Sequence, residues 1–410
     1  MLGPPAGSTF PQSTMKRPLV LDVTPAFADG PGASAKAARA LGENACDLLV
    51  RTSGRRLVLA APPRPPRSAA PPAERAAERR FADLRKWIIG DAPPVFSTAL
   101  MPKYGFLPSR ALIAPAMGAP RAPADAVFVT LDWRSFANPG LQAWLEAQVS
   151  LRVLAVPLGA WALDFPEYLA REERASFERA IAAALRRTDA FLAPDSACAA
   201  RLKAQTAQSP RRPDVPTVQL PSDLASSQPA QRDGELAESP YVVAVGPIDA
   251  RANILLLLQG LRDLVAHGDR PPKLVLVGKR GRQIEQVAPM LDWCEAIRPF
   301  VAEAPDLDAD GLRKLIFNAR ALVAPAFAAS EAALLRDVQM IGTPVIASDI
   351  PSHRDALGSD AELLHPLDGV GWREAIRRSA QARPAAGPDA AALRQWSDWL
   401  LEFGEYVASL

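Results

Sequence analysis

Short apolar runs alternate with longer amphipathic stretches throughout the second half of the chain, between about Tyr241 and Ala380. The runs are continuous and are bounded by glycine, proline or charged residues, a pattern typical of strands that are buried on both faces. Repeated succession of strand and helix predicts a doubly wound parallel α/β sheet. The expected strands are Tyr241–Val245, Lys273–Val277, Arg298–Val301, Ala321–Ala324, Pro344–Ala347 and Ala361–Leu364, and the expected helices are Asn253–His267, Gln283–Ala296, Asp310–Asn318, Glu331–Ile341 and Gly371–Ala380.

The first half of the chain repeats this alternation less regularly, and Glu167–Arg187 is its strongest amphipathic helix. The two halves together predict an α/β fold of two Rossmann-like domains that face each other across a cleft. A final helix, Asp389–Leu410, is expected to pack back across the domains through an apolar side formed by Trp396, Trp399, Leu400 and Phe403. The expected strands of the first half are Pro18–Asp22, Arg56–Ala60, Val127–Leu131, Val153–Val156, Phe191–Ala193 and Thr217–Leu220.

Two breaks in the periodic pattern organise the chain. The proline-rich stretch Ala61–Pro72 excludes helix and central strand and is expected to be a surface loop. The polar stretch Pro221–Pro240 has no period and is expected to contain the interdomain linker. The resulting domain boundaries are a disordered tail at 1–16, an N-terminal domain at 17–222, a linker at 223–239, a C-terminal domain at 240–386 and a crossover helix at 387–410.

Composition and charge restrict the classes of partner. The 410 residues include 47 Lys and Arg against 45 Asp and Glu, so the formal net charge is only +2 and no clustered basic face for nucleic acid is expected. Cysteines number three and lie far apart, which favours a reducing compartment. No signal peptide, zinc spacing or apolar run of about 18 residues is found. We expect a cytoplasmic protein that is either free or peripheral at the inner face of a membrane.

Two glycine-containing corners follow expected strands. Gly246 ends the first strand of the second half, where the backbone can turn tightly, and Arg251 lies near the start of the next helix. Gly278, Lys279 and Arg280 form the same construction after the second strand, and cations beside a helix N-terminus suit a diphosphate. The plainer interpretation of each corner is an ordinary strand–helix loop with solvated charge. Two corners at the carboxyl ends of strands support each other, because ligands bind there in open α/β sheets.

The segment Ala321–Gly358, ALVAPAFAASEAALLRDVQMIGTPVIASDIPSHRDALG, carries a family resemblance. Together with VGPIDARANI, LVLVGKRG and the following DAELLHPLD, it resembles the retaining GT-B type glycosyltransferases of the mannosyltransferase-like group, also called glycosyl transferases group 1. The match covers most of residues 240–385, and LVLDVTPAF, ALDFPEYLAREE and DAFLAPDSACAARL add weaker similarity in the first half.

The chain departs from that family at several polar positions. The family carries two glutamates eight positions apart, which fall here on Ala329 and Asp337. Ala252 replaces the family's phosphate-contacting lysine, and the acceptor-side His-Asp pair falls on Leu158 and Gly159. The donor-site motif is therefore degenerate, and the resemblance leaves transfer activity open.

The resemblance implies roles for the remaining site residues. Gly246, Arg251, Gly278, Lys279 and Arg280 would bind the donor diphosphate without a metal or other cofactor.

The catalytic and sugar-binding positions are less well defined. Asp337 is either a catalytic and ribose-binding carboxylate or a solvent-facing helix residue. Glu331 either substitutes for the lost glutamate or is a helix N-terminal charge capped by Ser330, which is also the expected sugar contact. His353 is expected to be a surface histidine rather than a cleft residue.

These residues favour a retaining hexosyltransferase that moves a hexose from a GDP- or UDP-linked sugar to a glycan or lipid-linked acceptor in surface polysaccharide assembly. The nucleotide-sugar is a co-substrate in this hypothesis. The alternative is a pseudo-glycosyltransferase that keeps the fold and serves as a nucleotide-binding or scaffolding partner of another transferase. A sugar epimerase on the same fold would need a His and carboxylate set that the sequence lacks.

Overall fold

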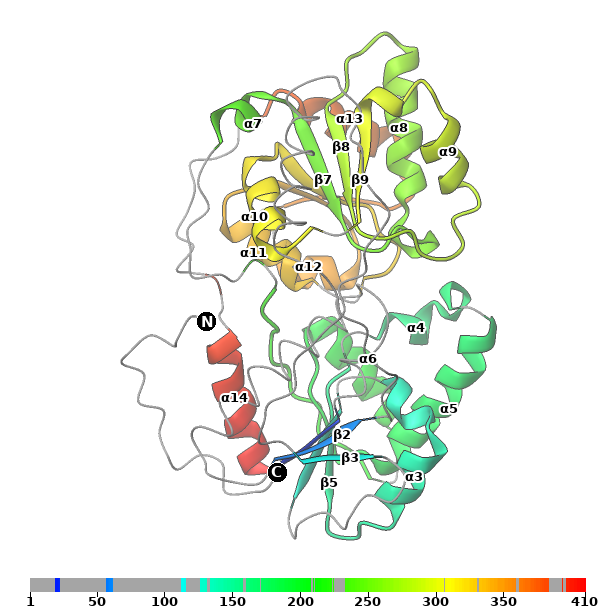
Figure 1. Cartoon of the computed structure of the whole chain (residues 1–410), viewed down its shortest axis with the longest axis vertical. Helices are drawn as coiled ribbons and strands as arrows, with labels where there is room; N and C mark the ends of the chain where they lie inside the picture. The colour runs from blue at the N-terminus through cyan, green and yellow to red at the C-terminus, as the bar shows by residue number, and fades with distance from the viewer. Residues whose placement is uncertain are drawn as a thin grey trace, which may run out of the picture.

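The architecture is seen in a computed structural model of the chain (Figure 1). The structure describes residues 19–22, 57–61, 112–115 and 126–410, the last range with gaps at 131–132, 158–159, 170, 208, 210, 223, 225–232, 306, 330–331, 359–360, 383–392 and 394–395. The predicted tail at 1–16 and most of the proline-rich loop lie outside the described residues.

The N-terminal half forms a parallel sheet of six strands in the order β3-β2-β1-β4-β5-β6. This is the Rossmann order, in which the chain leaves the first strand toward one edge and later returns to build the other. The strands are β1 (Leu19–Asp22), β2 (Leu57–Ala61), β3 (Leu112–Pro115), β4 (Val127–Thr130), β5 (Arg152–Ala155) and β6 (Ala190–Phe191).

The C-terminal half forms a second parallel six-stranded sheet in the order β12-β11-β10-β7-β8-β9, which is the same topology. Its switch point lies between β7 and β10, where Val243 pairs with Leu322. The strands are β7 (Tyr241–Val245), β8 (Lys273–Val277), β9 (Val301–Ala304), β10 (Ala321–Ala324), β11 (Val345–Ser348) and β12 (Glu362–Leu364). The predicted fold of two Rossmann-like α/β units is confirmed.

Helices cover both faces of the C-terminal sheet. Tyr241 and Val243 of β7 pack with α10, α11 and α12 on one face, and Val242 and Ala244 pack with α8, α9 and α13 on the other. Alternate strand residues thus enter opposite cores, which explains the continuous apolar runs. These helices are α8 (Ile254–Ala266), α9 (Val287–Trp293), α10 (Ala309–Asn318), α11 (Ala333–Met340), α12 (Pro351–Leu357) and α13 (Gly369–Ser379).

The remaining described helices belong to the N-terminal half, to the connection between the halves and to the C-terminal segment, and they vary widely in length. They are α3 (Pro139–Glu146), α4 (Trp161–Asp164), α5 (Arg171–Arg187), α6 (Ser196–Thr206), α7 (Gly234–Glu238) and α14 (Trp396–Ser409). Short 3₁₀ turns add η2 (Trp133–Ala137), η3 (Pro166–Tyr168), η4 (Ala250–Ala252) and η5 (Arg298–Phe300). Within the described residues, no helix combines the length and apolarity needed to cross a bilayer.

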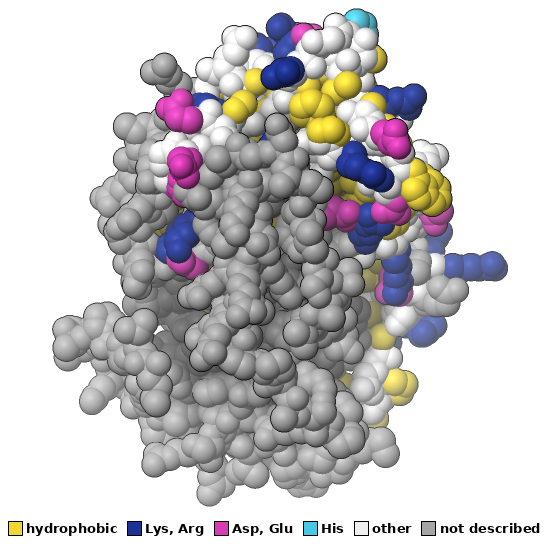
Figure 2. Space-filling view, turned by 45° about the horizontal axis from the view of Figure 1, so that its top comes forward, with side chains coloured by type: hydrophobic (Ala, Val, Ile, Leu, Met, Phe, Trp, Pro, Cys, Tyr) yellow, Lys and Arg dark blue, Asp and Glu magenta, His cyan; other side chains and the backbone are white. Residues whose placement is uncertain are grey.

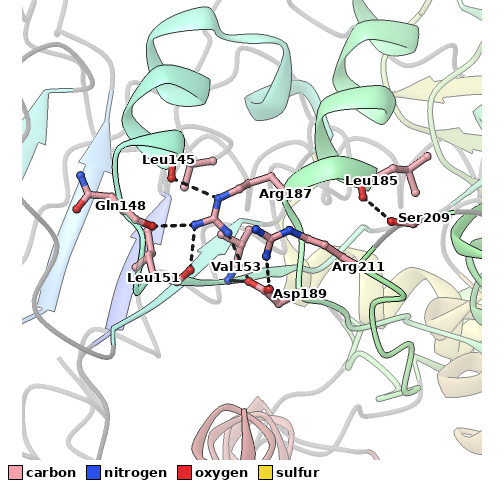
Figure 3. Close-up of polar contacts among 9 residues, drawn as sticks. All are labelled: Leu145, Gln148, Leu151, Val153, Leu185, Arg187, Asp189, Ser209 and Arg211. Atoms are coloured by element: carbon pink, nitrogen blue, oxygen red, sulfur yellow. Dashed lines mark hydrogen bonds and ion pairs between the residues drawn. The ribbon is translucent and has the colours of Figure 1, made fainter.

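One arginine ties α3 and α5 to the start of β5 (Figure 3). Arg187 is at the end of α5 and its side chain is 14% exposed. It donates to the carbonyl oxygens of Leu145, Gln148 and Leu151 at 3.3, 3.2 and 2.9 Å. Its ion-pair partner Asp189 accepts from the N–H of Val153 at 2.8 Å and from Arg211 at 2.6 Å. This network fixes the strand that leads into α4.

The C-terminal helix α14 lies against the N-terminal half, as expected of a crossover helix (Figure 1). The Tyr406 hydroxyl donates to Asp214 at 3.3 Å, and Trp399 and Phe403 stack with ring centroids 4.9 Å apart. Both rings are buried. Helix α14 therefore packs against the half that contains β1.

Several predicted elements differ from the observed ones. The strand expected at Arg298–Val301 begins only at Val301, because Pro299 lacks the N–H of a ladder strand and starts η5 instead. The strand expected at Thr217–Leu220 is reduced to one isolated bridge, between Thr217 and Ala193. The helix expected to begin at Glu167 begins at Arg171. Strand β3 and helix α12 were not expected.

The described residues of the predicted linker at 223–239 are folded into the C-terminal half. The linker contains α7, and Leu224 and Leu236 are fully buried in the core of the C-terminal half. The predicted domain boundaries themselves stay a prediction.

Candidate functional site

The first glycine corner leaves the end of β7 at the switch point of the C-terminal sheet. Gly246 has φ +137°, a region that favours glycine, so the backbone turns there without strain. Asp249 caps the following turn by accepting from the N–H of Ala252 at 2.9 Å. Asn253 has φ +55° and its side-chain amide donates to the carbonyl oxygens of Pro325 and Pro366 at 3.0 and 2.9 Å. These contacts join the corner to the loops after β10 and β12.

The second glycine corner is bonded directly to the first. The N–H of Ile248 donates to the Lys279 carbonyl at 2.9 Å, and the N–H of Gly281 donates to the Ile248 carbonyl at 2.8 Å. Gly278 has φ +149°, and a Cβ atom there would overlap the carbonyl oxygen of Gly246. The two corners therefore meet, as a shared phosphate site requires.

Arg251 lies in the first corner, on the side that faces the N-terminal half. Its guanidinium carbon is 4.7 Å from the centroid of the Trp161 ring, and its Nη2 is 3.5 Å from the Asp249 carboxylate. The Arg251 side chain is 15% exposed. Its carbonyl oxygen accepts from the N–H of Phe327, which connects the corner to the loop after β10.

Arg280 points to carboxylates of its own domain. It bonds Glu303 through Nε at 2.8 Å and Nη2 at 2.7 Å, and Asp292 through Nη1 at 3.1 Å and Nη2 at 2.6 Å. These bonds, with Glu303 foremost, raise the pKa of Arg280, and they lower the pKa of Asp292. These bonds occupy most of the N–H donors of the guanidinium, so little of its hydrogen-bonding capacity is left for a phosphate. Lys279, the neighbouring predicted phosphate contact, is half-buried in the corner.

Asp337 is located on α11 and is fully buried, so the solvent-facing interpretation is wrong. Its carboxylate accepts from the N–H of Ser222 at 3.1 Å and from Arg336 at 3.0 and 3.1 Å. Arg336 also bonds Gln219 and the Leu220 carbonyl. In this arrangement Asp337 anchors the chain where it passes from one half to the other, and both of its carboxylate oxygens are engaged in that anchor.

The remaining predicted site residues are described only in part. Ser330, Glu331, Leu158 and Gly159 lie outside the described residues. Ala332 is the N-cap of α11 and has no side-chain acceptor, so the start of this helix is uncapped by its own N-cap residue.

His353 is buried rather than on the surface, so that expectation is wrong. Its Nδ1 donates to the Ser348 carbonyl at 3.0 Å, and burial lowers its pKa to about 4. A neutral ring with its proton on Nδ1 donates a hydrogen bond to that carbonyl, which explains how a histidine can lie on the buried side of α12.

The two halves contact each other across a seam formed by the loops at the carboxyl ends of both sheets. Tyr168 stacks on Phe327 with centroids 6.3 Å apart and planes at 9°. Gln283 donates to the Glu167 carbonyl at 3.0 Å, and the seam also includes the Arg282–Glu173 ion pair at 2.8 Å. Farther along, the Asp355 carboxylate accepts from the N–H of Ser196 at 2.7 Å.

Sequence reasoning missed the seam residues Trp161, Tyr168 and Phe327. An aromatic residue in a strand–helix loop has no local signal that distinguishes packing within a domain from contact across domains. Among the described residues, no group of three or more His, Cys, Asp or Glu is arranged to hold a metal ion. The positive charge near the corners comes from the arginine and lysine side chains.

Comparison with known proteins identifies the fold through solved structures and not through sequence. No family model matches the chain, and no curated protein matches it by sequence. Solved structures do match: sucrose-phosphate synthase from Thermosynechococcus elongatus has 16% identity and a TM-score of 0.57, covering 96% of this chain and 94% of that one. HepE of Anabaena, solved in complex with UDP, has 12% identity and a TM-score of 0.58, covering 96% and 100%. WaaG, a glycosyltransferase involved in lipopolysaccharide biosynthesis, has 14% identity and a TM-score of 0.53, covering 95% of each chain. The chain therefore has the two-domain GT-B fold of these glycosyltransferases.

Proposed function

We propose that the protein is a retaining glycosyltransferase that moves a hexose from a GDP- or UDP-linked sugar to a glycan or lipid-linked acceptor in surface polysaccharide assembly. The observation that carries the proposal is the hydrogen-bonded pair of glycine corners at the switch point, through Ile248 and Lys279. Ligands bind at this position in open α/β sheets. The likeness to HepE, which was solved with UDP, and to WaaG supports the same class of reaction.

In this proposal the corners bind the diphosphate of the donor. Backbone N–H groups at the start of α11, where Ala332 offers no side-chain cap, are suited to an anion. Arg251 and Lys279 of the two corners supply positive charge. Negative charge develops on the diphosphate as its bond to the sugar breaks, so cations held in advance stabilise the transition state. The proposal requires no resident metal or cofactor, since the side chains neutralise the phosphates.

Other predicted residues take different places in the proposal. Arg280, bonded to Glu303 and Asp292, shapes the second corner rather than binding phosphate. Asp337 is committed to the Ser222 N–H and is not a proposed ligand. Ser330 and Glu331 stay predicted sugar and catalytic contacts. The proposed location is the cytoplasm or the inner face of a membrane, where a lipid-linked acceptor could be reached.

Nucleotide binding is the direct test of the donor site. Millimolar UDP or GDP should raise the melting temperature of the full chain by a few degrees, because a ligand at about 100 times its Kd stabilises the native state by roughly 2.7 kcal/mol. Replacing both Arg251 and Lys279 by alanine should abolish the shift. The matched control replaces Arg262 and Arg270, two exposed cations away from the corners, and should retain it.

Turnover separates transfer from binding. A protein that binds UDP or GDP but releases neither nucleotide from the corresponding nucleotide-sugars, with or without glycan acceptors, would contradict the transferase proposal. A wild-type protein whose melting temperature no nucleotide changes would contradict the donor site as well.

A further inference from the structure

Trp161 of the N-terminal half covers the predicted phosphate-binding arginine of the C-terminal half. It begins α4, which follows β5, whereas Arg251 lies in the corner after β7. The guanidinium carbon is 4.7 Å from the ring centroid, within the distance of a cation–π contact. The contact thus joins the two Rossmann-like units at the corner that the proposed donor would occupy.

Neighbouring contacts hold the segment Trp161–Glu173 against the same corners. The Glu167 carbonyl accepts from Gln283 at 3.0 Å, and Glu173 pairs with Arg282 at 2.8 Å. Burial, followed by the charges of Glu167 and of Asp249 across the seam, raises the pKa of Tyr168. The position of Trp161 is therefore set by a group of contacts and not by one side chain.

On the described part of the face in Figure 2, cationic and acidic side chains lie intermixed, so no single basic patch dominates there.

The contact between Arg251 and Trp161 is compatible with binding of an anion to the guanidinium. The N–H donors of a guanidinium lie in its plane and point outward from its edges. The guanidinium carbon of Arg251 lies over the face of the indole ring, whereas Asp249 meets Nη2 3.5 Å away. The attraction between cation and ring therefore restricts the position of the guanidinium, and the indole offers no acceptor that would compete with a phosphate.

We propose that Trp161 is a positioning residue for a nucleoside diphosphate, acting from the N-terminal half by orienting Arg251 in the C-terminal half. This inference rests on the proposed donor site. Its consequence is that the affinity of the corners for the nucleotide depends on contact between the two halves. Removing the indole leaves the charge of Arg251 in place but loses its orientation.

Calorimetric titration of the full chain with UDP and GDP tests the inference. Trp161→Ala should weaken binding by roughly 2- to 30-fold, the range expected of a cation–π contact. Trp161→Phe should recover part of this loss, because phenylalanine offers a weaker ring face. The control Trp293→Ala removes an exposed tryptophan on α9 and should leave the affinity unchanged.

A double-mutant cycle distinguishes orientation from general loss of structure. In an Arg251→Ala background, Trp161→Ala should cause no further loss of affinity, since there is no guanidinium to orient. An equal loss in both backgrounds, or none in the wild-type background, would overturn the inference while leaving the donor site intact. If wild-type protein binds neither nucleotide, the proposed function fails first. If Trp161→Ala does not fold, the same cycle is measured with Trp161→Phe, and the same two outcomes apply.

Discussion

Replacement of Asp337 separates an anchoring carboxylate from a ribose ligand. The Asp337 side chain is fully buried, and its partner Arg336 is 16% exposed. Asp337→Ala removes the acceptor of the Ser222 N–H and leaves a largely buried guanidinium without this carboxylate. Losing one member of such a buried pair costs about 3–5 kcal/mol. Asp337→Asn can keep an acceptor for Ser222, but it loses the charge and turns an NH2 group toward Arg336, so we expect about 1–3 kcal/mol.

Chemical denaturation followed by circular dichroism measures these losses, and nucleotide titration of the folded variants measures binding. The control is Asp263→Ala, because Asp263 is 42% exposed and its partner Arg373 also bonds Glu374. This control should cost much less, because an exposed ion pair contributes little to stability. The anchor argument would be refuted if Asp337→Ala were no less stable than the control and had lost its nucleotide affinity, as expected of a ribose ligand.

Two further predictions concern His353 and Gly278 of the C-terminal half. His353 has a pKa of about 4 against an ordinary 6.5, so the unfolded state binds more protons between these values. Stability should therefore fall by about 3 kcal/mol as the pH drops from 6.5 to 4. In His353→Gln this fall in stability with pH should be absent, whereas the control His267→Gln, at an exposed histidine, should behave like wild type. Parallel curves of stability against pH for all three proteins would contradict the role given to His353. Gly278→Ala should destabilise by roughly 2 kcal/mol or more, because its Cβ meets the Gly246 carbonyl. Gly268→Ala also has a positive φ but open space, so thermal unfolding of the two variants should differ, and equal losses would show that only backbone strain matters.

The fold could be predicted from local pattern because buried parallel strands have a simple signature. The bounds of β7, β8 and β10 match the expected strands to the residue. The prediction failed where a proline interrupts an apolar run, as at Pro299, or where a short element such as α12 has few periodic positions. Both glycine corners follow β7 and β8 because each corner is a contiguous piece of sequence, and their role in phosphate binding stays a prediction.

The rest of the site depends on contacts between distant segments. Asp337 and Ser222 are 115 positions apart, and nothing in the α11 sequence indicates that a polar residue on its buried face meets the backbone amide of Ser222. Trp161 and Arg251 likewise belong to different domains. Pattern and propensity describe neighbours along the chain. They could therefore indicate which charged residues are candidates for the site, but they could not predict the partners of those residues in the fold.

The bond between Asp355 and Ser196 has a consequence for how domain motion can be observed. Asp355 lies in α12 of the C-terminal half, and its carboxylate accepts from the first residue of α6 in the other half. Whenever the two sheets move apart, the backbone amide of Ser196 loses that acceptor and meets water. Separation of the two halves should therefore speed up hydrogen exchange at the Ser196 amide, so this exchange rate can be used to follow interdomain motion.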